Sequence, residues 1–344
     1  MMVACTGPAE STSLLVATST TVPTTTAASP VSETSEATTA TSLPELPAPI
    51  TSDGAAIVDL ADREIARLEI ISGPDWMVEA FGSIWVEISR GAVFRINPED
   101  NSIVAEVPFT QARCAGLSGS PEAIWTCHRE FNQPIHVARI DPTSNQVVAV
   151  VEAGKAPDQI RFVYAKERVW VLNGAGDQVR GIDPATNTLG PGIDLGTRCT
   201  ELAAAGDVLW AACPIEGVVF RIGSDGTVVR SPAIFEDARR ISVGQFVFVG
   251  FRTGTAQLDP ETLAVLAVYD AVPGLLGSLW TGGGDLWIRL DAGPYLTRID
   301  PTTLTVIETI ESREILSGGD VLEAFGSIWT TAFDNNVVIR LAPA

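Results

Sequence analysis

The seven residues EAFGSIW at positions 79–85 return unchanged at positions 323–329, 244 residues later. Degenerate versions of this segment recur between the two copies, and each ends in a large aromatic residue. The aromatic residues, hereafter the anchors, lie 40, 45, 40, 38, 39 and 42 residues apart and are Trp85, Trp125, Trp170, Trp210, Phe248, Trp287 and Trp329. A period near forty residues with seven copies predicts one large repeat domain.

Composition separates a tail from this domain. Residues 1–54 contain a lipobox-like start followed by a Thr/Ser/Pro-rich stretch that lacks periodicity, which predicts a disordered stalk. Residues 55–344 carry the repeats and are predicted to form a single domain. The net charge is −20, so nucleic acid and anionic membrane surfaces are not expected as partners. The sequence contains no apolar run long enough to span a bilayer.

Small residues before Cys5 resemble the end of a bacterial lipoprotein signal peptide, whose charged and apolar regions would lie upstream of this start. We therefore expect lipidation at Cys5, with the domain outside the cytoplasm, either anchored to the bacterial cell membrane or secreted. A lipid at Cys5 would be the only membrane contact. The alternative is a chance cysteine in a disordered tail.

Four further cysteines occupy equivalent places in two repeats. Cys114 and Cys199 each precede an anchor by eleven residues, whereas Cys127 and Cys213 follow the same anchors by two and three residues. An early residue of one strand in an antiparallel hairpin lies opposite a late residue of the next. This predicts the disulfides Cys114–Cys127 and Cys199–Cys213, with a bulge for the offset, in an oxidising compartment. Free buried thiols in a cytosolic protein are the alternative.

Each repeat is predicted to contain four short strands. In the first repeat they are residues 77–81, 83–88, 92–96 and 103–107. The junction between the third and fourth strands repeatedly carries Asp-Pro or Asn-Pro, which is typical of type I turns. These pairs begin at Asn97, Asp141, Asp183, Asp259 and Asp300, and residues 223–226 replace them in the fourth repeat. The in-phase positions indicate turns rather than metal ligands.

Four-stranded units of this length predict an all-β fold, a seven-bladed β-propeller. The anchors would be buried between blades, because burying about 200 Å² of one Trp gains about 5 kcal/mol before entropy is subtracted. After Trp329 the chain supplies only one further strand, residues 337–341. Residues 64–70 are predicted to pair with it as an N-terminal strand that closes the ring. Residues 57–59 are a second candidate strand, which leaves the register of closure open.

The segment Gly82-Ser83-Ile84-Trp85, the R-I-D-P-T turns at 139–143 and 298–302 and the spacing resemble YVTN-type propellers and the virginiamycin B (streptogramin) lyase-like superfamily over residues 63–344. The resemblance implies the propeller fold. Streptogramin lyases use magnesium with His and Glu side chains from several blades, whereas this chain has only His128 and His136, both in the second repeat. No catalytic or metal-binding residue is carried over, and no cofactor is expected.

Binding residues are expected where the chain enters the innermost strands, because these connections ring one mouth of the central channel. The residues read from these positions are Asp75, Trp76, Arg113, Asp158, Arg198, Arg239, Arg240 and Asp320. Clustered arginine would favour an anionic or zwitterionic ligand, and blade-to-blade salt bridging is the alternative. We predict a monomeric cell-surface or secreted module that binds a small anionic ligand or a protein. A divergent lyase-like or lactonase-like enzyme with its site in the central funnel is the alternative.

Overall fold

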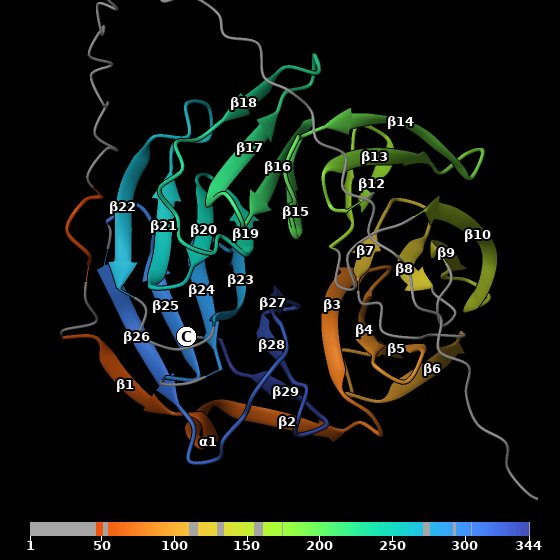
Figure 1. Ribbon diagram of the computed structural model, residues 1–344. Coiled ribbons are helices and arrows are strands. Elements are labelled where there is room, and N and C mark those ends of the chain that lie inside the picture. The colour runs from red at the N-terminus through yellow and green to blue at the C-terminus, as the bar shows by residue number, and fades with distance from the viewer. Residues whose placement is uncertain are drawn as a thin grey trace, which may run out of the picture. The chain divides into compact units, whose positions relative to one another are not determined.

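The computed structural model describes residues 46–50, 54–109, 116–128, 134–154, 161–173, 175–270, 276–291, 294–303 and 305–343, apart from the side chains of His128, Asp270 and Leu276. They belong to one compact unit, Leu43–Ala344. Its described residues form 29 strands and one short helix (Figure 1). In this described part, no helix is long and apolar enough to cross a membrane. Cys5 and most of the predicted stalk lie outside the described residues.

The strands form seven sheets, and the innermost strands of successive sheets contact one another all the way around a ring. This confirms the prediction of a seven-bladed propeller. Blades 1 to 3 are, from the innermost strand outward, β3 (Pro74–Ala80), β4 (Ser83–Ile88), β5 (Ala92–Ile96), β6 (Ile103–Pro108); β7 (Leu117–Gly119), β8 (Ile124–His128), β9 (Ile135–Asp141), β10 (Gln146–Gly154); and β11 (Val163–Ala165), β12 (Arg168–Asn173), β13 (Gln178–Asp183), β14 (Thr188–Asp194).

The remaining four blades follow the same antiparallel order. Blades 4 and 5 are β15 (Glu201–Ala205), β16 (Val208–Cys213), β17 (Val218–Ile222), β18 (Val228–Arg230); and β19 (Arg240–Val243), β20 (Val247–Phe251), β21 (Gly254–Leu258), β22 (Val265–Asp270). Blades 6 and 7 are β23 (Leu276–Gly282), β24 (Asp285–Leu290), β25 (Leu296–Asp300), β26 (Thr305–Glu311); and β27 (Val321–Ala324), β28 (Ser327–Ala332), β29 (Val337–Leu341), with β2 (Glu64–Glu69) outermost.

An N-terminal strand closes the ring, as the sequence predicts. β2 pairs antiparallel with β29 from Glu64 opposite Leu341 to Glu69 opposite Val337. The second candidate strand also exists: β1 (Ala56–Asp59) pairs parallel with β26 and becomes a fifth strand of blade 6. A single helical turn, α1 (Leu60–Arg63), which the sequence pattern did not predict, joins β1 to β2. One chain segment therefore adds strands to blades 6 and 7 in succession.

The structure has two faces that differ in their connections. We call the face at which the innermost strands begin the leading face, and the face at which they end the trailing face. Because each blade is an antiparallel meander, the turns between first and second strands and between third and fourth strands lie on the trailing face. The Asp-Pro turns are of the second kind. Asp141, for example, accepts the backbone N–H of Thr143 at 2.9 Å, and this bond holds the pKa of Asp141 below its usual value.

The anchors are buried between blades, as predicted. Trp85 packs against Ile124 and Ile140 of blade 2. The indole N–H of Trp85 donates to the carbonyl of Ala80 at 3.0 Å, which pairs the polar edge of the ring inside its own blade. The equivalent bond joins Trp329 to Ala324.

A cation lies on most anchors and reaches the next blade. Arg95 of β5 stands opposite Trp85 in the register, with its guanidinium 5.0 Å from the ring centroid. It donates to the carbonyl of Pro142 at 2.8 Å and to the side chain of Asn145 at 3.1 Å, both in the Asp-Pro turn of blade 2. Asn145 has φ +53°, the left-handed conformation that Asn tolerates at low cost. We call this arrangement the interblade clamp.

The clamp recurs with small variations. Arg139 joins blade 2 to blade 3, Arg221 joins blade 4 to blade 5, and Gln257 joins blade 5 to blade 6, each donating to the carbonyl of the turn proline. Arg340 of blade 7 lies 5.0 Å from the centroid of Trp329 and donates to Pro98 and Asn101 of blade 1, so the clamp also closes the ring. Arg298 of blade 6 pairs instead with Asp285 and Glu308. Blade 7 offers it no such turn, because its outer strand comes from the N-terminal segment.

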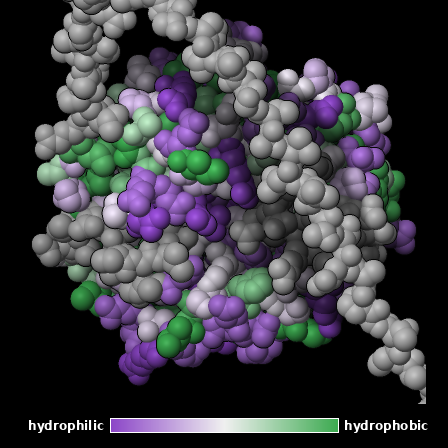
Figure 2. All heavy atoms as spheres, viewed as in Figure 1, coloured by the Kyte–Doolittle hydropathy of each residue, from purple (hydrophilic) through white to green (hydrophobic). Residues whose placement is uncertain are grey.

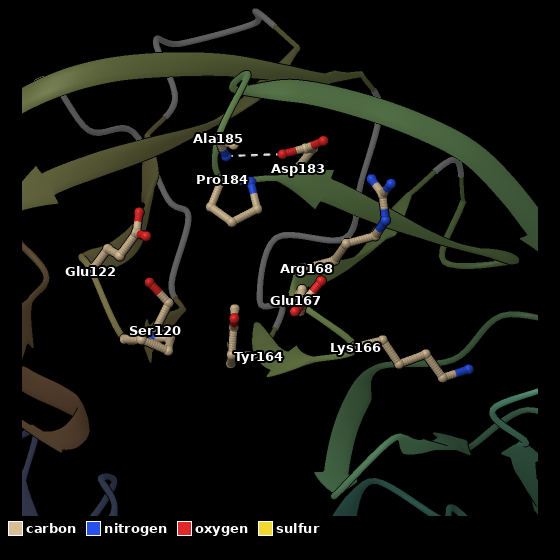
Figure 3. Close-up of a pocket in the computed structure, with 10 residues that line it drawn as sticks. Ser120, Glu122, Tyr164, Lys166, Glu167, Arg168, Asp183, Pro184 and Ala185 are labelled. Atoms are coloured by element: carbon tan, nitrogen blue, oxygen red, sulfur yellow. Dashed lines mark hydrogen bonds between the residues drawn. The ribbon is translucent and has the colours of Figure 1, made fainter.

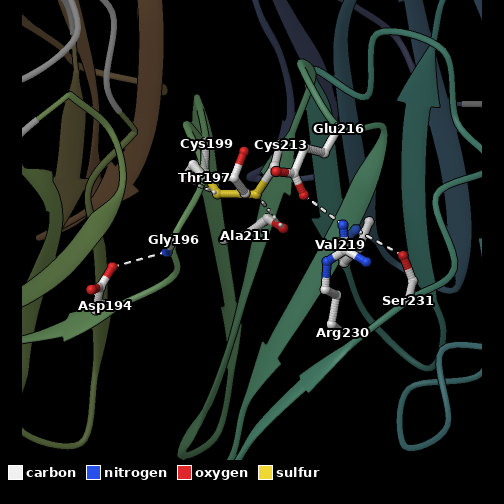
Figure 4. The surroundings of a disulfide bond; sticks show 10 residues. All are labelled: Asp194, Gly196, Thr197, Cys199, Ala211, Cys213, Glu216, Val219, Arg230 and Ser231. Carbon is white, nitrogen blue, oxygen red and sulfur yellow. Dashed lines mark hydrogen bonds and ion pairs between the residues drawn. A yellow bond between two sulfur atoms is a disulfide. The ribbon is translucent and has the colours of Figure 1, made fainter. Parts of the chain in front are cut away.

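Cys199 and Cys213 form the predicted disulfide at the leading face of blade 4 (Figure 4). Cys213 ends β16, and Cys199 precedes β15 by two residues. The N–H of Cys199 donates to the carbonyl of Gly176 in blade 3 at 2.9 Å. Cys127 is also disulfide-bonded, while its predicted partner Cys114 lies outside the described residues.

Replacing Arg340 with Ala is expected to lower the free energy of unfolding by about 2–4 kcal/mol, because a cation–π contact and several charge-assisted hydrogen bonds are lost at the point of closure. Urea unfolding followed by tryptophan fluorescence measures the change. The matched control is Arg90→Ala, whose exposed side chain pairs with Glu106 at only 4.0 Å and should contribute less than about 0.5 kcal/mol. Equal effects of the two substitutions would contradict the clamp.

Replacing both Cys199 and Cys213 with Ala is expected to lower the free energy of unfolding by about 3 kcal/mol, since the disulfide closes a loop with a sequence separation of 14. Reduction of the unmodified protein should shift the unfolding midpoint at least as far. A midpoint that is unchanged in the double variant would show that this bond does not contribute to stability.

Candidate functional site

The start of each innermost strand brings one residue of every blade to the leading face. This residue stands nine positions before the anchor, or eight in blade 5. From blade 1 to blade 7 these residues are Trp76, Gly116, Arg161, Glu201, Arg240, Ser278 and Asp320. The hairpin registers of the blades are nearly the same, so the set forms a ring around the channel. With Asp75, we call its charged and aromatic members the mouth cluster: Asp75, Trp76, Arg161, Glu201, Arg240 and Asp320.

The mouth cluster crosses the channel. Arg161 of blade 3 donates to Asp320 of blade 7 at 3.1 Å, although these two blades are not neighbours. Trp76 of blade 1 lies under the guanidinium groups of Arg161 and Arg240, at 4.4 and 5.4 Å from its ring centroid. A side chain that contacts blades 3 and 5 from blade 1 must extend across the axis. Trp76 itself is buried.

Glu201 links the two arginines. One of its carboxylate oxygens lies 3.1 Å from Nη1 of Arg240, and the other lies 3.6 Å from Nε of Arg161. The side chain of Glu201 is 2% exposed, whereas Arg161 and Arg240 remain 19% and 23% exposed. The carboxylate is therefore enclosed, whereas the two arginine side chains are partly exposed.

Asp320 is the most heavily bonded carboxylate of the cluster. It accepts the backbone N–H of Met77 at 3.1 Å and the hydroxyl of Ser278, in addition to Arg161. Its own backbone N–H donates to the hydroxyl of Thr331 at 2.7 Å. These bonds satisfy a charge that would otherwise be costly to bury.

A buried arginine holds the loop that presents Asp320. Arg289 of β24 is completely buried and donates to the carbonyls of Leu316 and Gly318, with its guanidinium 4.4 Å from the centroid of Tyr295. Gly318 also donates its N–H to Asp291 at 2.9 Å. The loop before β27 is thus fixed from blade 6.

Asp75 differs from the other two carboxylates, because none of the described residues forms a hydrogen bond or ion pair with its side chain. Burial raises the pKa of Asp75 to about 6, and the charge of Asp320 adds to this effect, while Arg240 and Arg161 oppose it. Burial disfavours the charge of Arg161 as well, but Asp320 and Glu201 outweigh this and raise its pKa. Arg161 therefore stays charged at neutral pH, and Asp75 takes up a proton on mild acidification.

The structure brings four of the eight residues read from the sequence into the mouth cluster: Asp75, Trp76, Arg240 and Asp320. Arg239 is 67% exposed and pairs with Asp237 at 2.6 Å, and Arg198 is exposed as well. Arg113 and Asp158 lie outside the described residues. Sequence reasoning missed Arg161 and Glu201, each three positions beyond the residue selected in its blade. Counting nine positions back from each anchor would have found both.

In the described ranges, no group of three His, Cys, Asp or Glu side chains could hold a metal ion. Of the two histidines, His136 stands opposite His128 in the hairpin of blade 2.

Comparison with solved structures places the fold among known propellers. A streptogramin B lyase matches with a TM-score of 0.67 and 14% identity, covering 80% of this chain and 96% of the lyase. A catalytically inactive virginiamycin B lyase from Staphylococcus aureus, solved with quinupristin, has a TM-score of 0.66 and 14% identity over 81% of this chain and 99% of its own. The WD40 repeats of RRP9 have a TM-score of 0.67 and 9% identity over 83% and 99%.

This chain shares their propeller fold. At these identities the likeness concerns fold alone, and it agrees with the lyase-like propeller that the repeats resemble. No family model and no curated protein matches the sequence.

Replacing Asp75 with Asn is expected to change stability in a pH-dependent manner. The pKa of Asp75 is about 6 in the folded protein and near 3.8 when unperturbed, so the folded state binds the proton more tightly. The unmodified protein should lose stability relative to the variant as the pH rises from about 4 to about 6, and the difference should level off above that range. Melting temperatures of both proteins between pH 4 and 8 measure it. A constant difference across this range would mean that Asp75 has an ordinary pKa.

Proposed function

We propose that the protein is an extracytoplasmic binding module whose mouth cluster takes a small ligand that carries both a carboxylate and an ammonium group. One observation carries the proposal: two partly exposed arginine side chains lie beside a carboxylate, Asp75, that has no partner among the described residues. Guanidinium binds carboxylate in a fixed two-point geometry, and Asp75 is suited to an ammonium group.

The charges around Trp76 favour a zwitterion over a simple anion. The cluster contains three carboxylates and two guanidinium groups, and the two enclosed carboxylates already neutralise much of the arginine charge. A plain anion would gain from the arginines but be repelled by Asp75 and by the acidic protein as a whole. A ligand with both charges can pair its carboxylate with the arginines and its ammonium group with Asp75.

The proposed location rests on the disulfides and on the tail. Disulfides persist in oxidising compartments, and Cys199–Cys213 is compatible with a protein outside the cytoplasm. We further propose that Cys5 is lipidated and that the Thr/Ser/Pro-rich stretch serves as a stalk. On the face shown in Figure 2, hydrophilic residues separate the hydrophobic areas of the coloured residues.

A thermal-shift panel of free amino acids and dipeptides tests the binding site, with acetate and alkylamines as single-charge probes. Zwitterions should raise the melting temperature and single-charge probes should not. Arg240→Lys should weaken binding at least about tenfold, since a lysine cannot reproduce the guanidinium geometry. Asp75→Asn should remove the preference for zwitterions over carboxylic acids.

The matched control is Arg239→Ala, which removes an exposed arginine adjacent in sequence but outside the cluster. It should leave the shifts unchanged. A panel that produces no shift at all, or an Arg240→Lys variant that binds as well as the unmodified protein, would refute this site.

A divergent lyase-like or lactonase-like activity is a second candidate, and Asp75 is the observation in its favour. A carboxyl group with a pKa of about 6 and no partner in the described part of the chain can act as a general base near neutral pH. Magnesium-dependent turnover of a cyclic ester that disappears in Asp75→Asn would support catalysis. Binding without turnover would leave the binding module as the function.

A further inference from the structure

Blade 3 reverses the clamp on the trailing face. In blades 1 and 7 the clamp arginine also donates to a serine two positions before the anchor, from Arg95 to Ser83 and from Arg340 to Ser327, both at 2.9 Å. Blade 3 has Gly181 at the clamp position, opposite Trp170, and carries its arginine two positions before that anchor, as Arg168. In blade 3 the arginine therefore lies on the second strand and the small residue on the third, which is the opposite of blades 1 and 7.

The reversal leaves Arg168 without a role in holding the blades together. Lys166 replaces the missing clamp: its ammonium lies 5.9 Å from the centroid of Trp170 and donates to the carbonyl of Gly223 in blade 4 at 2.7 Å. Within the described part of the chain, no hydrogen bond, ion pair or ring contact involves the guanidinium of Arg168. The stem of Arg168 occupies the space that a side chain at position 181 would need, since a Cβ there would come within 2.9 Å of its Cδ.

A cavity of about 470 Å³ lies beside this arginine, between blades 2 and 3 (Figure 3). Its wall includes Ser120, Glu122, Tyr164, Glu167, Arg168 and Pro184. Lys166 points away from the other labelled side chains, in keeping with its bond to blade 4. The volume falls in the range of sites that hold small organic molecules.

Several polar groups around the cavity already form hydrogen bonds or ion pairs within the protein. The hydroxyl of Ser120 accepts the indole N–H of Trp125, and Glu122 pairs with Arg139 at 3.2 Å. Asp183 accepts the backbone N–H of Ala185 in its turn. The guanidinium of Arg168, the hydroxyl of Tyr164 and the carboxylate of Glu167 have no partner among the described residues, so a ligand would meet two donors and one acceptor.

The turn that carries these residues is conformationally unusual. Lys166 and Glu167 both have positive φ, +52° and +56°, where blades 1 and 7 place a glycine at the second turn position. Two consecutive residues with a Cβ in this region are strained. Such strain persists where the surrounding structure or a function requires the side chains. Lys166 is required by the clamp.

We propose that this cavity, the blade 3 cavity, binds a small organic anion whose carboxylate or phosphate pairs with Arg168 and whose neighbouring oxygen accepts the hydroxyl of Tyr164. Arginine suits both head groups, because its planar fork donates two parallel hydrogen bonds to either. The surrounding acidic side chains select against binding by charge alone and favour an anion that fits both donors. The site is separate from the mouth cluster, because it opens on the trailing face.

Arginine side-chain resonances in ¹⁵N-labelled protein test the proposal by titration with inorganic phosphate and, separately, with acetate. One arginine Nε–H resonance should shift saturably in the millimolar range, and Arg168→Lys should identify it by its loss. The head group that saturates at the lower concentration tells phosphate from carboxylate. No saturable shift with either probe, or a shift that survives Arg168→Lys, would overturn the site.

Restoring the repeat provides the second variant. The double substitution Arg168→Ser with Gly181→Arg returns the cation to the clamp position of the other blades, so the melting temperature should be equal or higher while binding falls at least tenfold. Arg90→Ser, which removes an exposed arginine of blade 1, should leave binding unchanged. Arg240→Lys should also leave it unchanged, which separates this site from the mouth. A double variant that binds as tightly as the unmodified protein would refute the role of Arg168.

Discussion

The interblade clamp is the interaction on which the ring depends. Each anchor fills the gap between blades, but dispersion against a neighbouring sheet does not fix how far one blade rotates relative to the next. A guanidinium that stacks on its own anchor and donates to a backbone carbonyl across the gap fixes this geometry, because both contacts are directional. The Asp-Pro turn is therefore more than a tight connection: it presents the carbonyl that the preceding blade binds.

Because the clamp needs an anchor and a turn in most repeats, the propeller fold could be predicted from the sequence. The prediction failed only for segments that do not repeat. The anchors, the turns and the spare strand at residues 64–70 are local patterns with a fixed period, and the structure confirms each of them. The period also placed β2 beside β29, because an incomplete last blade leaves one edge to cover. Helix α1 and the parallel pairing of β1 are not part of the repeat, and no pattern in their sequence predicted them.

The mouth cluster was only half predictable for a related reason. Selecting residues from the connections that enter the innermost strands fails where these connections vary in length, and Arg161 and Glu201 lie three positions beyond the residues so chosen. Counting from the anchor succeeds, since the hairpin register is conserved among blades while the connections are not. Which of the seven positions carry charge, and which charges meet across the axis, depends on the closed ring and on no local pattern.

The clamps between neighbouring blades and the ion pairs of the mouth cluster constrain the ring differently. A clamp joins two neighbouring blades and would also form in a ring with a different number of blades, because it needs only the turn of the next blade. The pairing of Arg161 with Asp320 and the contacts of Trp76 with two blades opposite it require a channel of one width. A buried ion network adds little net stability when intact but is costly to break, so it penalises any other blade number more than it strengthens this one. The same charges that specify the ring thus surround Trp76, where the proposed ligand would bind.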